Sequence, residues 1–369
     1  MKDLIKGDSD WHDTINQNFE EVGASLSEKA NNIDSNRSTA DKSITGAINE
    51  LNSSKARQSD LEQLGNVNLL INGDFKIWQR GSNTFTADGS KMYTADRWGF
   101  FRSGWATGAI CSQFDGGNGY EYLIRHTNNI DTATAVQQII DIPLTHSLKG
   151  KKLTLSFKAR TGLNVTDTIV SAQIGAYKAD SVGMGNGFKY YLNGENLVLK
   201  TVNSSNQKYI FTTDISAPCD ADYLTVVILC YVHGTTSEHY IALSEVKLEI
   251  GTIATPFLSR TYEEELAMCQ RYYQNYSNAI FNGQVLGQNN AMDSNINFRV
   301  RMRKTPTITV YNAIDNTPNL LSCWDTSKST ATITGFWGFS DQGFCQIVGT
   351  NFNVGSKYGF KFIADAEIY

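Results

Sequence analysis

Three tryptophans of this chain lie beside small or short polar residues. Trp105 lies in a turn-like segment between two glycines, Asp325 follows Trp324, and Trp337 precedes a glycine. An exposed indole stacks on the C–H face of a sugar, while short polar side chains bond its hydroxyl groups. Loops on a rigid β scaffold commonly carry such sites. The four residues are therefore candidate glycan-binding residues, with packing or a contact between subunits as the alternative for each.

Two other tryptophans are expected in a core. Apolar residues flank Trp78 and Trp98, and large aromatic side chains dominate the cores of β-sandwiches. Arg80, Asp96 and Arg97 lie in the same segments. We interpret these three as an ion-pair group that supports the core, with no catalytic role.

Signals for metal binding or catalysis are weak. Asp74 and Glu245 (or Glu249 in its place) are candidate ligands of a structural calcium, because hard cations prefer carboxylate oxygens. His233 and His239 lack a third ligand, and the glycine-rich stretches lack the strand–helix context of a phosphate loop. We therefore expect no catalytic residue and no other cofactor. A glycosidase needs only two carboxylates, so glycan cleavage stays an alternative.

Three arginines form a basic stripe near the C-terminus. Arg299, Arg301 and Arg303 alternate with apolar residues, and Lys304 follows. Guanidinium groups bind phosphate in a fork geometry, which would suit a phosphate-bearing glycan. We favour the other interpretation, a solvated strand face or pairing with acidic residues of another subunit, because charged strand faces are ordinary.

The elements that carry these residues are mainly strands. Residues 66–260 alternate apolar and polar side chains between Gly- and Asn-rich turns, which predicts a two-sheet, jelly-roll-like β-sandwich. The expected strands are Glu121 to His126, Ala133 to Ile140, Leu153 to Ala159, Ile169 to Tyr177, Leu197 to Val202, Lys208 to Thr213, Tyr223 to Val232 and Tyr240 to Ile250.

Residues 261–369 begin with a helix and continue as strands. Thr261 and Glu264 have the spacing of a capping box, and Leu266, Cys269 and Tyr273 follow at helical spacing. This region is predicted to form a second β-sandwich. Its expected strands are Ile296 to Met302, Thr307 to Tyr311, Ala331 to Trp337, Phe344 to Gly349 and Tyr358 to Ile368.

Residues 1–65 are polar and sparsely apolar, and they predict a helical stalk. The first apolar spacings alternate four and three, which is the seam of a coiled coil. One such helix cannot bury its seam alone, so we expect a parallel trimer; a disordered linker is the alternative. The seam residues are Ile15, Phe19, Val22, Leu26, Ile33, Ile44, Ile48 and Leu51.

Composition narrows the class of partner. The net charge of -5 disfavours nucleic acid and anionic membrane. The first residues lack the apolar core of a signal peptide, and the longest apolar run is too short to span a bilayer. The six cysteines are scattered without a C-x-x-C pair, which favours free buried thiols. We therefore expect that the protein does not insert into a membrane. We also expect that it assembles in a reducing cytosol.

Several segments resemble phage tail-fibre and receptor-binding proteins. Asn68 to Gly81, followed by Tyr93 to Trp98, resembles the opening of the carbohydrate-binding-module-like domain of such fibres. Val246 to Arg260 resembles the closing strand of that domain, and Glu263 to Tyr273 the linker helix that follows it. Ser43 to Asn52 is similar to their stalks. Weaker matches, at Phe298 to Thr307 and Ala364 to Ile368, are similar to their distal tip domain.

The resemblance implies a homotrimeric virion protein, assembled in the bacterial cytoplasm. Its N-terminus would attach to a phage tail or baseplate protein, and its distal part would adhere, without catalysis, to a bacterial surface polysaccharide. No catalytic motif of the family is matched, so no catalytic residue is carried over. The alternatives are a tail-associated glycan depolymerase, a purely structural fibre or adaptor, and a monomeric secreted carbohydrate-binding protein.

Overall fold

The computed structural model describes most of the chain from residue 67 onward and one segment before it. The described residues are 11–30, 67–81, 85–87, 91–102, 109–117, 119–126, 134–141, 151–162, 165, 168–178, 182–183, 190–191, 200–213, 222–232, 239–287, 291–324 and 330–368. The chain divides into two units, Met1–Asn66 and Val67–Tyr369. Each unit is described by itself below.

The first unit contains one described helix, α1 (Trp11–Ala30). The predicted seam residues in it are Ile15, Phe19, Val22 and Leu26. The Phe19 side chain is 73% exposed and the Leu26 side chain 62% exposed in the single chain. The other predicted seam residues lie outside the described part, so a coiled coil beyond α1 stays a prediction.

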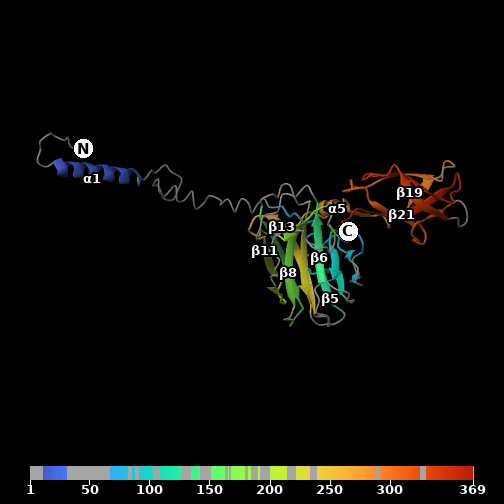
Figure 1. Ribbon diagram of the computed structural model, residues 1–369, viewed down its shortest axis with the longest axis horizontal. Coiled ribbons are helices and arrows are strands. Elements are labelled where there is room, and N and C mark those ends of the chain that lie inside the picture. Colours follow the sequence, from blue (N-terminus) through green and yellow to red (C-terminus); the bar gives the residue numbers. More distant parts are fainter. Residues whose placement is uncertain are drawn as a thin grey trace. The chain divides into compact units, whose positions relative to one another are not determined.

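The sequence prediction of a β-sandwich for the first part of the second unit is confirmed. One sheet has the strand order β1-β4-β5-β13-β7-β11, and the other runs β10-β8-β12-β6-β3-β2 with β9 beside β8 (Figure 1). The strands are β1 (Phe85–Ala87), β2 (Met92–Tyr93), β3 (Gly99–Arg102), β4 (Ala109–Asp115), β5 (Tyr120–His126), β6 (Thr134–Ile140), β7 (Leu153–Thr161), β8 (Ile169–Tyr177), β9 (Tyr190–Tyr191), β10 (Lys200–Thr201), β11 (Gln207–Thr212), β12 (Tyr223–Tyr231) and β13 (Tyr240–Ile250).

Alternation decides which face of each sandwich strand is buried. In β7, Leu155 and Phe157 point into the core, whereas Lys158 and Arg160 lie on the outer face. The strand β12 is buried along most of its length, as its continuous apolar run predicts, and it lies inside its sheet between β6 and β8. The outer face of the sheet with β5, β13 and β7 is thus left to polar side chains.

A short helix, α5 (Tyr262–Gln270), follows the sandwich. Its predicted capping box is confirmed: the Thr261 hydroxyl accepts from the Glu264 amide, and the Glu264 carboxylate accepts from the Thr261 amide. The prediction that Tyr273 continues the helix is wrong. Tyr273 begins strand β14, where it pairs with Asp365.

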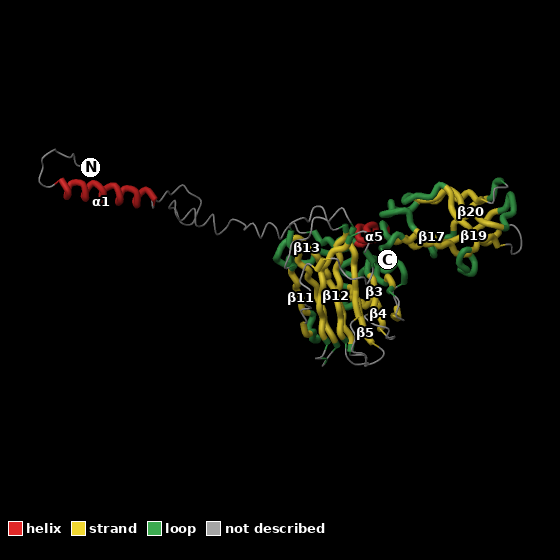
Figure 2. The backbone as a smooth tube through the Cα atoms, in the orientation of Figure 1, coloured by secondary structure: helices red, strands yellow, loops and turns green. Residues whose placement is uncertain are grey.

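The C-terminal strands form one sheet, where the sequence predicts a second sandwich. They are β14 (Tyr273–Asn275), β15 (Phe281–Gln284), β16 (Ala291–Asn297), β17 (Thr307–Asn312), β18 (Leu320–Cys323), β19 (Thr330–Trp337), β20 (Gly343–Thr350) and β21 (Lys357–Asp365). Figure 2 labels β17, β19 and β20 of this sheet. The order β21-β15-β16-β20-β19-β18 returns to its start, because β18 also pairs with β21. The sheet therefore closes into a small barrel.

Aromatic side chains fill this barrel. Phe360 and Phe362 are fully buried, and Phe344 packs against Phe362 with ring centroids 5.5 Å apart. The predicted strand from Ile296 to Met302 is wrong beyond Asn297: Phe298 and Met302 are buried, but the backbone there is irregular. Apolar alternation predicted correctly which side chains are buried. It did not reveal that the backbone of this segment hydrogen-bonds to loops and not to a neighbouring strand: for example, the Phe298 amide donates to the Gln342 carbonyl (2.8 Å).

Candidate functional site

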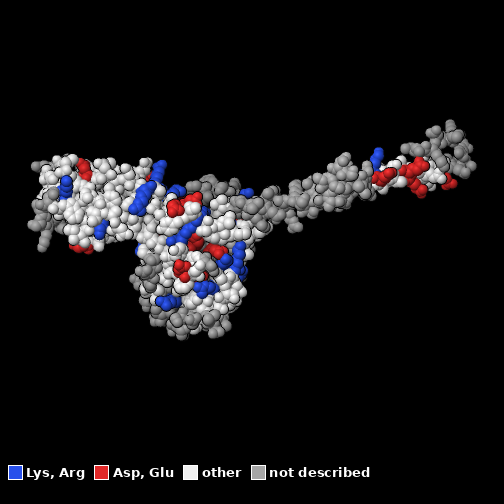
Figure 3. All heavy atoms as spheres, turned by 180° about the vertical axis from the view of Figure 1, so that it is seen from behind, with Lys and Arg blue, Asp and Glu red and all other residues white. Residues whose placement is uncertain are grey.

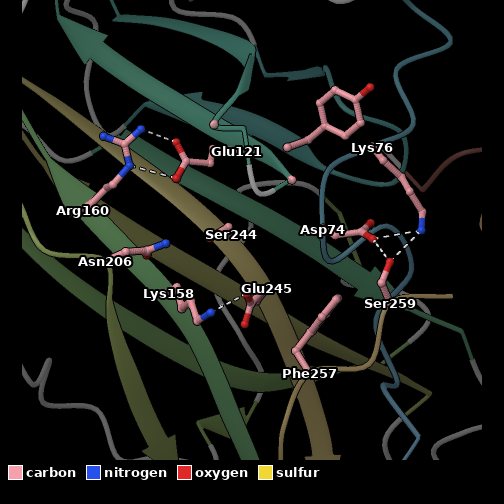
Figure 4. A pocket seen from close by; sticks show the side chains of 13 residues that line it. Asp74, Lys76, Glu121, Lys158, Arg160, Asn206, Ser244, Glu245, Phe257 and Ser259 are labelled. Atoms are coloured by element: carbon pink, nitrogen blue, oxygen red, sulfur yellow. Dashed lines mark hydrogen bonds and ion pairs between the residues drawn. The ribbon is translucent and has the colours of Figure 1, made fainter.

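A groove of about 670 Å³ crosses the outer face of the sandwich sheet. Its floor comes from the neighbouring strands β5, β13 and β7, and its walls come from loops on either side. Figure 4 shows its charged side chains arranged in pairs around the opening. The residues that line it include Asp74, Lys76, Tyr120, Glu121, Asn206, Ser244, Phe257 and Ser259.

Arg160 and Glu121 form a two-pronged ion pair at one side of the groove. Nε of Arg160 donates to Oε1 of Glu121 (2.9 Å) and Nη2 donates to Oε2 (2.5 Å). The third guanidinium nitrogen, Nη1, donates to the Tyr240 hydroxyl (2.7 Å). The hydrogen bonds to Glu121 raise the pKa of Arg160. The guanidinium plane is fixed as a result, before any ligand binds.

Lys158 and Glu245 form the second pair (2.5 Å). Glu245 has a φ of +52°, an uncommon value for a residue with a side chain. It lies where the register between β13 and β7 shifts, between Ser244 and Lys247. Such a bulge redirects a side chain that would otherwise follow strand alternation, and bulges are frequent beside functional sites. Here it places a carboxylate at the groove.

A third group lies opposite, where Asp74 contacts Lys76 (3.0 Å) and accepts from the Ser259 hydroxyl (2.5 Å) (Figure 4). Asp74 and Glu245, the predicted calcium ligands, thus line the same groove, and each already has a lysine partner. Oδ1 of Asp74 is buried without a partner in the described part of the chain. Within the same residues no cluster of three or more metal-ligating side chains exists. The calcium site stays a prediction.

The loop after β13 forms a wall of the groove and is held by a buried polar cluster. The amide and hydroxyl of Thr255 donate to Glu249 (2.8 and 2.5 Å), and Lys247 contacts the same carboxylate (3.1 Å). Lys247 and Glu249 are almost fully buried, although charged residues rarely are unless paired. The wall that presents Phe257 and Ser259 is therefore anchored to the sheet beneath it.

The groove combines aromatic and paired polar groups. The Tyr120 side chain is 42% exposed at its edge, and Phe257 is half-buried. Carboxylates accept hydrogen bonds from sugar hydroxyls, guanidinium and ammonium groups donate to them, and aromatic faces stack on pyranose rings. Such a surface suits an extended polyhydroxyl ligand. The face of the sandwich in Figure 3 shows this mixing of cationic and anionic side chains.

The predicted tryptophan sites are distributed elsewhere. Trp324 and Trp337 are on the barrel, 45% and 49% exposed. Trp337 is the last residue of β19, where it pairs with Gln346, and Trp324 follows the last residue of β18. The strands β18 and β19 are antiparallel neighbours, with Leu320 opposite Thr332. The two tryptophans therefore lie beyond opposite ends of the β18–β19 pairing. Trp105 and Asp325 are outside the described residues.

The predicted core tryptophans and their ion-pair group are confirmed. Trp98 is fully buried and Trp78 packs against the same core. Arg80 contacts Asp96 (3.2 Å), and burial raises the pKa of Asp96 to about 6 although Arg80 opposes that shift. Arg97 pairs with Glu367 at the C-terminal end, and both are buried.

This group also joins the barrel to the sandwich. The Arg97 guanidinium lies 3.4 Å from the centroid of the Tyr272 ring, and Arg80 reaches Asp365 (3.5 Å). Burial lowers the pKa of Arg97, but the charge of Glu367 and its neighbours outweighs this effect, so the pKa is raised. The sequence predicted the pairing type without revealing that half of the partners come from the last residues.

The arginine stripe lies on irregular backbone after β16, so the predicted strand face is wrong, and its acidic partners belong to the same chain. Arg301 pairs with Asp341 (2.7 Å), and Arg303 binds Asp141 of the sandwich through two nitrogens (2.9 and 3.0 Å). Arg299 lies over the Tyr276 ring, 4.6 Å from its centroid. Two of the three are thus satisfied by acidic residues.

Sequence reasoning missed the groove residues Tyr120, Glu121, Lys158 and Arg160. Lys158 and Arg160 were visible as the polar side of the strand from Leu153, which was recognised for its apolar side only. Two cations at i and i+2 on an outer face were the available signal. The bulge at Glu245 gave no signal in the sequence, because the residues around it have the pattern of an ordinary strand.

Two further observations concern the class of protein. No helix in the described ranges has the length and apolar character that crossing a membrane requires. Cys111, Cys230, Cys269 and Cys323 are buried thiols outside any disulfide, and Cys345 is an exposed one. Burial raises the pKa of Cys111 to about 12, which keeps that thiol protonated.

No family model matches the chain, and no curated protein sequence matches it significantly. Among solved structures, it is similar to the carbohydrate-binding module TmCBM61 in complex with β-1,4-galactotriose (9% identity, 50% of this chain, 99% of that chain, TM-score 0.29). A family 11 carbohydrate-binding module from Clostridium thermocellum in complex with a mixed-linked tetrasaccharide is also similar (13%, 48%, 99%, TM-score 0.29). The enzymatically active domain of bacteriophage CBA120 tailspike protein 4 is a third (12%, 50%, 22%, TM-score 0.26).

Proposed function

We propose that this protein binds a polysaccharide without cleaving it, and that the groove on the sandwich is the binding site. The observation that carries the proposal is an open groove in which Arg160–Glu121 and Lys158–Glu245 are already paired beside the exposed Tyr120 ring. Side chains fixed before binding lose little conformational freedom on contact with a sugar, which raises affinity.

The paired carboxylates also bear on catalysis. A glycosidase needs one protonated carboxyl as general acid and a second carboxylate within a set distance. In the groove, each of the three lining carboxyl groups, Glu121, Glu245 and Asp74, is paired with a cationic side chain, which differs from the arrangement of a free general acid beside a second carboxylate. Their presence in one groove is nevertheless the observation that favours a depolymerase as the second candidate.

The test measures binding and cleavage together. The full chain is applied to a printed array of bacterial surface polysaccharides, and reducing ends are assayed in solution with each polysaccharide bound. Tyr120→Ala is expected to weaken binding about two- to tenfold, since a stacked aromatic contributes about 0.5–1.5 kcal/mol. Tyr262→Ala, an exposed tyrosine of α5 outside the groove, is the matched control.

The outcomes separate the candidates. Binding that Tyr120→Ala weakens, with no release of reducing ends, supports the proposal. Release of reducing ends that Glu121→Gln abolishes would establish the depolymerase instead. Absence of binding to every polysaccharide would favour a structural fibre or adaptor.

The finer part of the proposal is a homotrimeric tail-fibre receptor-binding protein of a phage virion. Its N-terminus attaches to a tail or baseplate protein and its distal part adheres to the bacterial surface. One support is the resemblance of the sequence motifs to those of phage tail fibres. The other is the exposed apolar side chains of α1: Phe19 lies three residues before Val22 and Leu26 four residues after it, which is coiled-coil spacing. Three tethered copies raise avidity by about 10² to 10⁴.

The test of the trimer is the solution mass of the full chain. We expect a mass of three chains, which the double variant Phe19→Asp with Leu26→Asp should lose. A monomeric mass for the full chain contradicts the trimer.

A further inference from the structure

The indole of Trp324 lies across the outer face of the barrel. Trp324 follows β18, and its backbone amide donates to the Lys357 carbonyl of β21 (2.9 Å). Its ring nitrogen donates to Oδ1 of Asn282 on β15 (2.7 Å). Because β21 runs between β18 and β15, the ring spans the central strand and is held at both ends.

Gly359 of β21 makes this position available. A Cβ added there would lie 2.2 Å from Cζ2 and 2.6 Å from Nε1 of the indole. Any other residue would displace the ring. The outer face of a strand normally presents a side chain at every second residue, so a missing one leaves a shallow seat. The ring fills that seat and still keeps 45% of its surface exposed.

Two side-chain amides, each with one hydrogen-bonding atom unused among the described residues, border the indole. The Asn282 amide accepts from Trp324 through Oδ1, which leaves its Nδ2 to donate. Gln284 lies on the same face, two residues along β15, and opposes Lys357. Nε2 of Gln284 donates to Gly355 O (3.1 Å), which leaves its Oε1 to accept. One amide donor and one amide acceptor therefore flank an immobilised aromatic surface.

We propose that Trp324, Asn282 and Gln284 form a second saccharide-binding site, separate from the groove. A pyranose ring stacks on the exposed indole, Asn282 donates to one hydroxyl, and Gln284 accepts from another. Both amides are neutral, which suits a neutral sugar. The site does not depend on the groove, and together the two sites would let one chain hold a polysaccharide at two points.

The experiment separates the second site from the groove by working in a groove variant. The full chain carrying Tyr120→Ala is titrated with immobilised bacterial polysaccharides and with β-1,4-galactotriose and a mixed-linked β-glucan tetrasaccharide. Addition of Trp324→Ala is expected to lower the residual binding at least fivefold, and Asn282→Ala about threefold. Ile314→Ala, an exposed apolar residue of the same barrel, is the control and should change nothing.

Each other outcome overturns the second site. If Trp324→Ala leaves residual binding unchanged, the indole does not contact the sugar. If Tyr120→Ala alone abolishes binding, the groove is the sole site and the proposed function still stands. If Trp324→Ala lowers the solution mass of the assembly, the indole is a contact between copies of the chain.

Discussion

The sandwich and the barrel present two different surfaces. The sandwich groove is built from charged side chains in pairs, such as Arg160 with Glu121 and Lys158 with Glu245, on strands that leave their outer face polar. The barrel shows few charges on the face drawn in Figure 3, and its ordered feature is an indole seated over a glycine. In the groove, opposite charges hold one another in position. On the barrel, close packing holds a single aromatic ring.

Side chains of this molecule are ordered before binding in two ways. Paired charges are positioned by attraction and also leave hydrogen-bonding capacity for a ligand. The seated ring is positioned by close packing over Gly359 and by one hydrogen bond to Asn282, and it offers mainly a face. The groove should therefore discriminate between sugars by their hydroxyl pattern, and the indole should contribute affinity with little discrimination.

The largest expected effect concerns the link between the two regions. Arg97→Met removes the nearer cationic partner of the buried Glu367, which then keeps only the longer contact with Arg80 (3.6 Å). Breaking such a pair costs about 3–5 kcal/mol. We expect that loss in the free energy of unfolding from urea denaturation. A loss below about 1 kcal/mol would show that the two regions do not depend on this pair.

The second effect is a pH dependence of the same link. Burial raises the pKa of Asp96 to about 6 from 3.8. A carboxyl whose pKa is raised in the folded state contributes stability below its unfolded pKa, and this contribution is lost as pH rises through 6. The shift corresponds to about 3 kcal/mol.

Asp96→Asn removes this titration. The difference in free energy of unfolding, Asp96→Asn minus the parent chain, should rise by about 2.4 kcal/mol between pH 4 and pH 7, because pH 4 already lies just above the unfolded pKa. Comparing the two proteins cancels opposite contributions such as that of Asp141, whose pKa is lowered by Arg303 against the effect of burial. A difference that stays constant with pH would contradict the prediction.

Sequence patterning predicted more of the scaffold than of the site. Alternation identified β8 and β13 with their observed bounds, since half-buried strands have the period that their side chains impose. Alternation did not predict that the C-terminal sheet closes into a barrel, because the pairing of Ser322 with Gly359 joins segments far apart in sequence. The groove escaped it for the same reason: Glu121 and Arg160 meet only through strand order. Trp324 was identified from composition, but its seat over Gly359 was not.

The third effect sharpens the comparison at the groove. Arg160→Ala removes the donors to Glu121 and Tyr240 together. Hydrogen bonds to charged groups contribute about 1.5–3 kcal/mol, so polysaccharide binding should fall about 10- to 100-fold. The same change should leave the binding by the Trp324 site unaltered. Equal binding by Arg160→Ala and the parent chain on the array would remove the groove from the account.

The smallest effect concerns salt. The groove pairs Asp74 with Lys76, Glu121 with Arg160 and Glu245 with Lys158, so its charges balance. Binding of a neutral polysaccharide should change less than about twofold between 0.05 and 0.5 M NaCl, because screening acts on unbalanced charge. A tenfold loss of binding at high salt would indicate an anionic ligand.

The most direct test of the central claim is a crystal structure of the full chain with an oligosaccharide from the polysaccharide that it binds. The account predicts sugar density in the sandwich groove, stacked on Tyr120 and hydrogen-bonded to Arg160 and Glu121. Sugar density confined to any other part of the molecule, or a groove empty at saturating oligosaccharide, would contradict it.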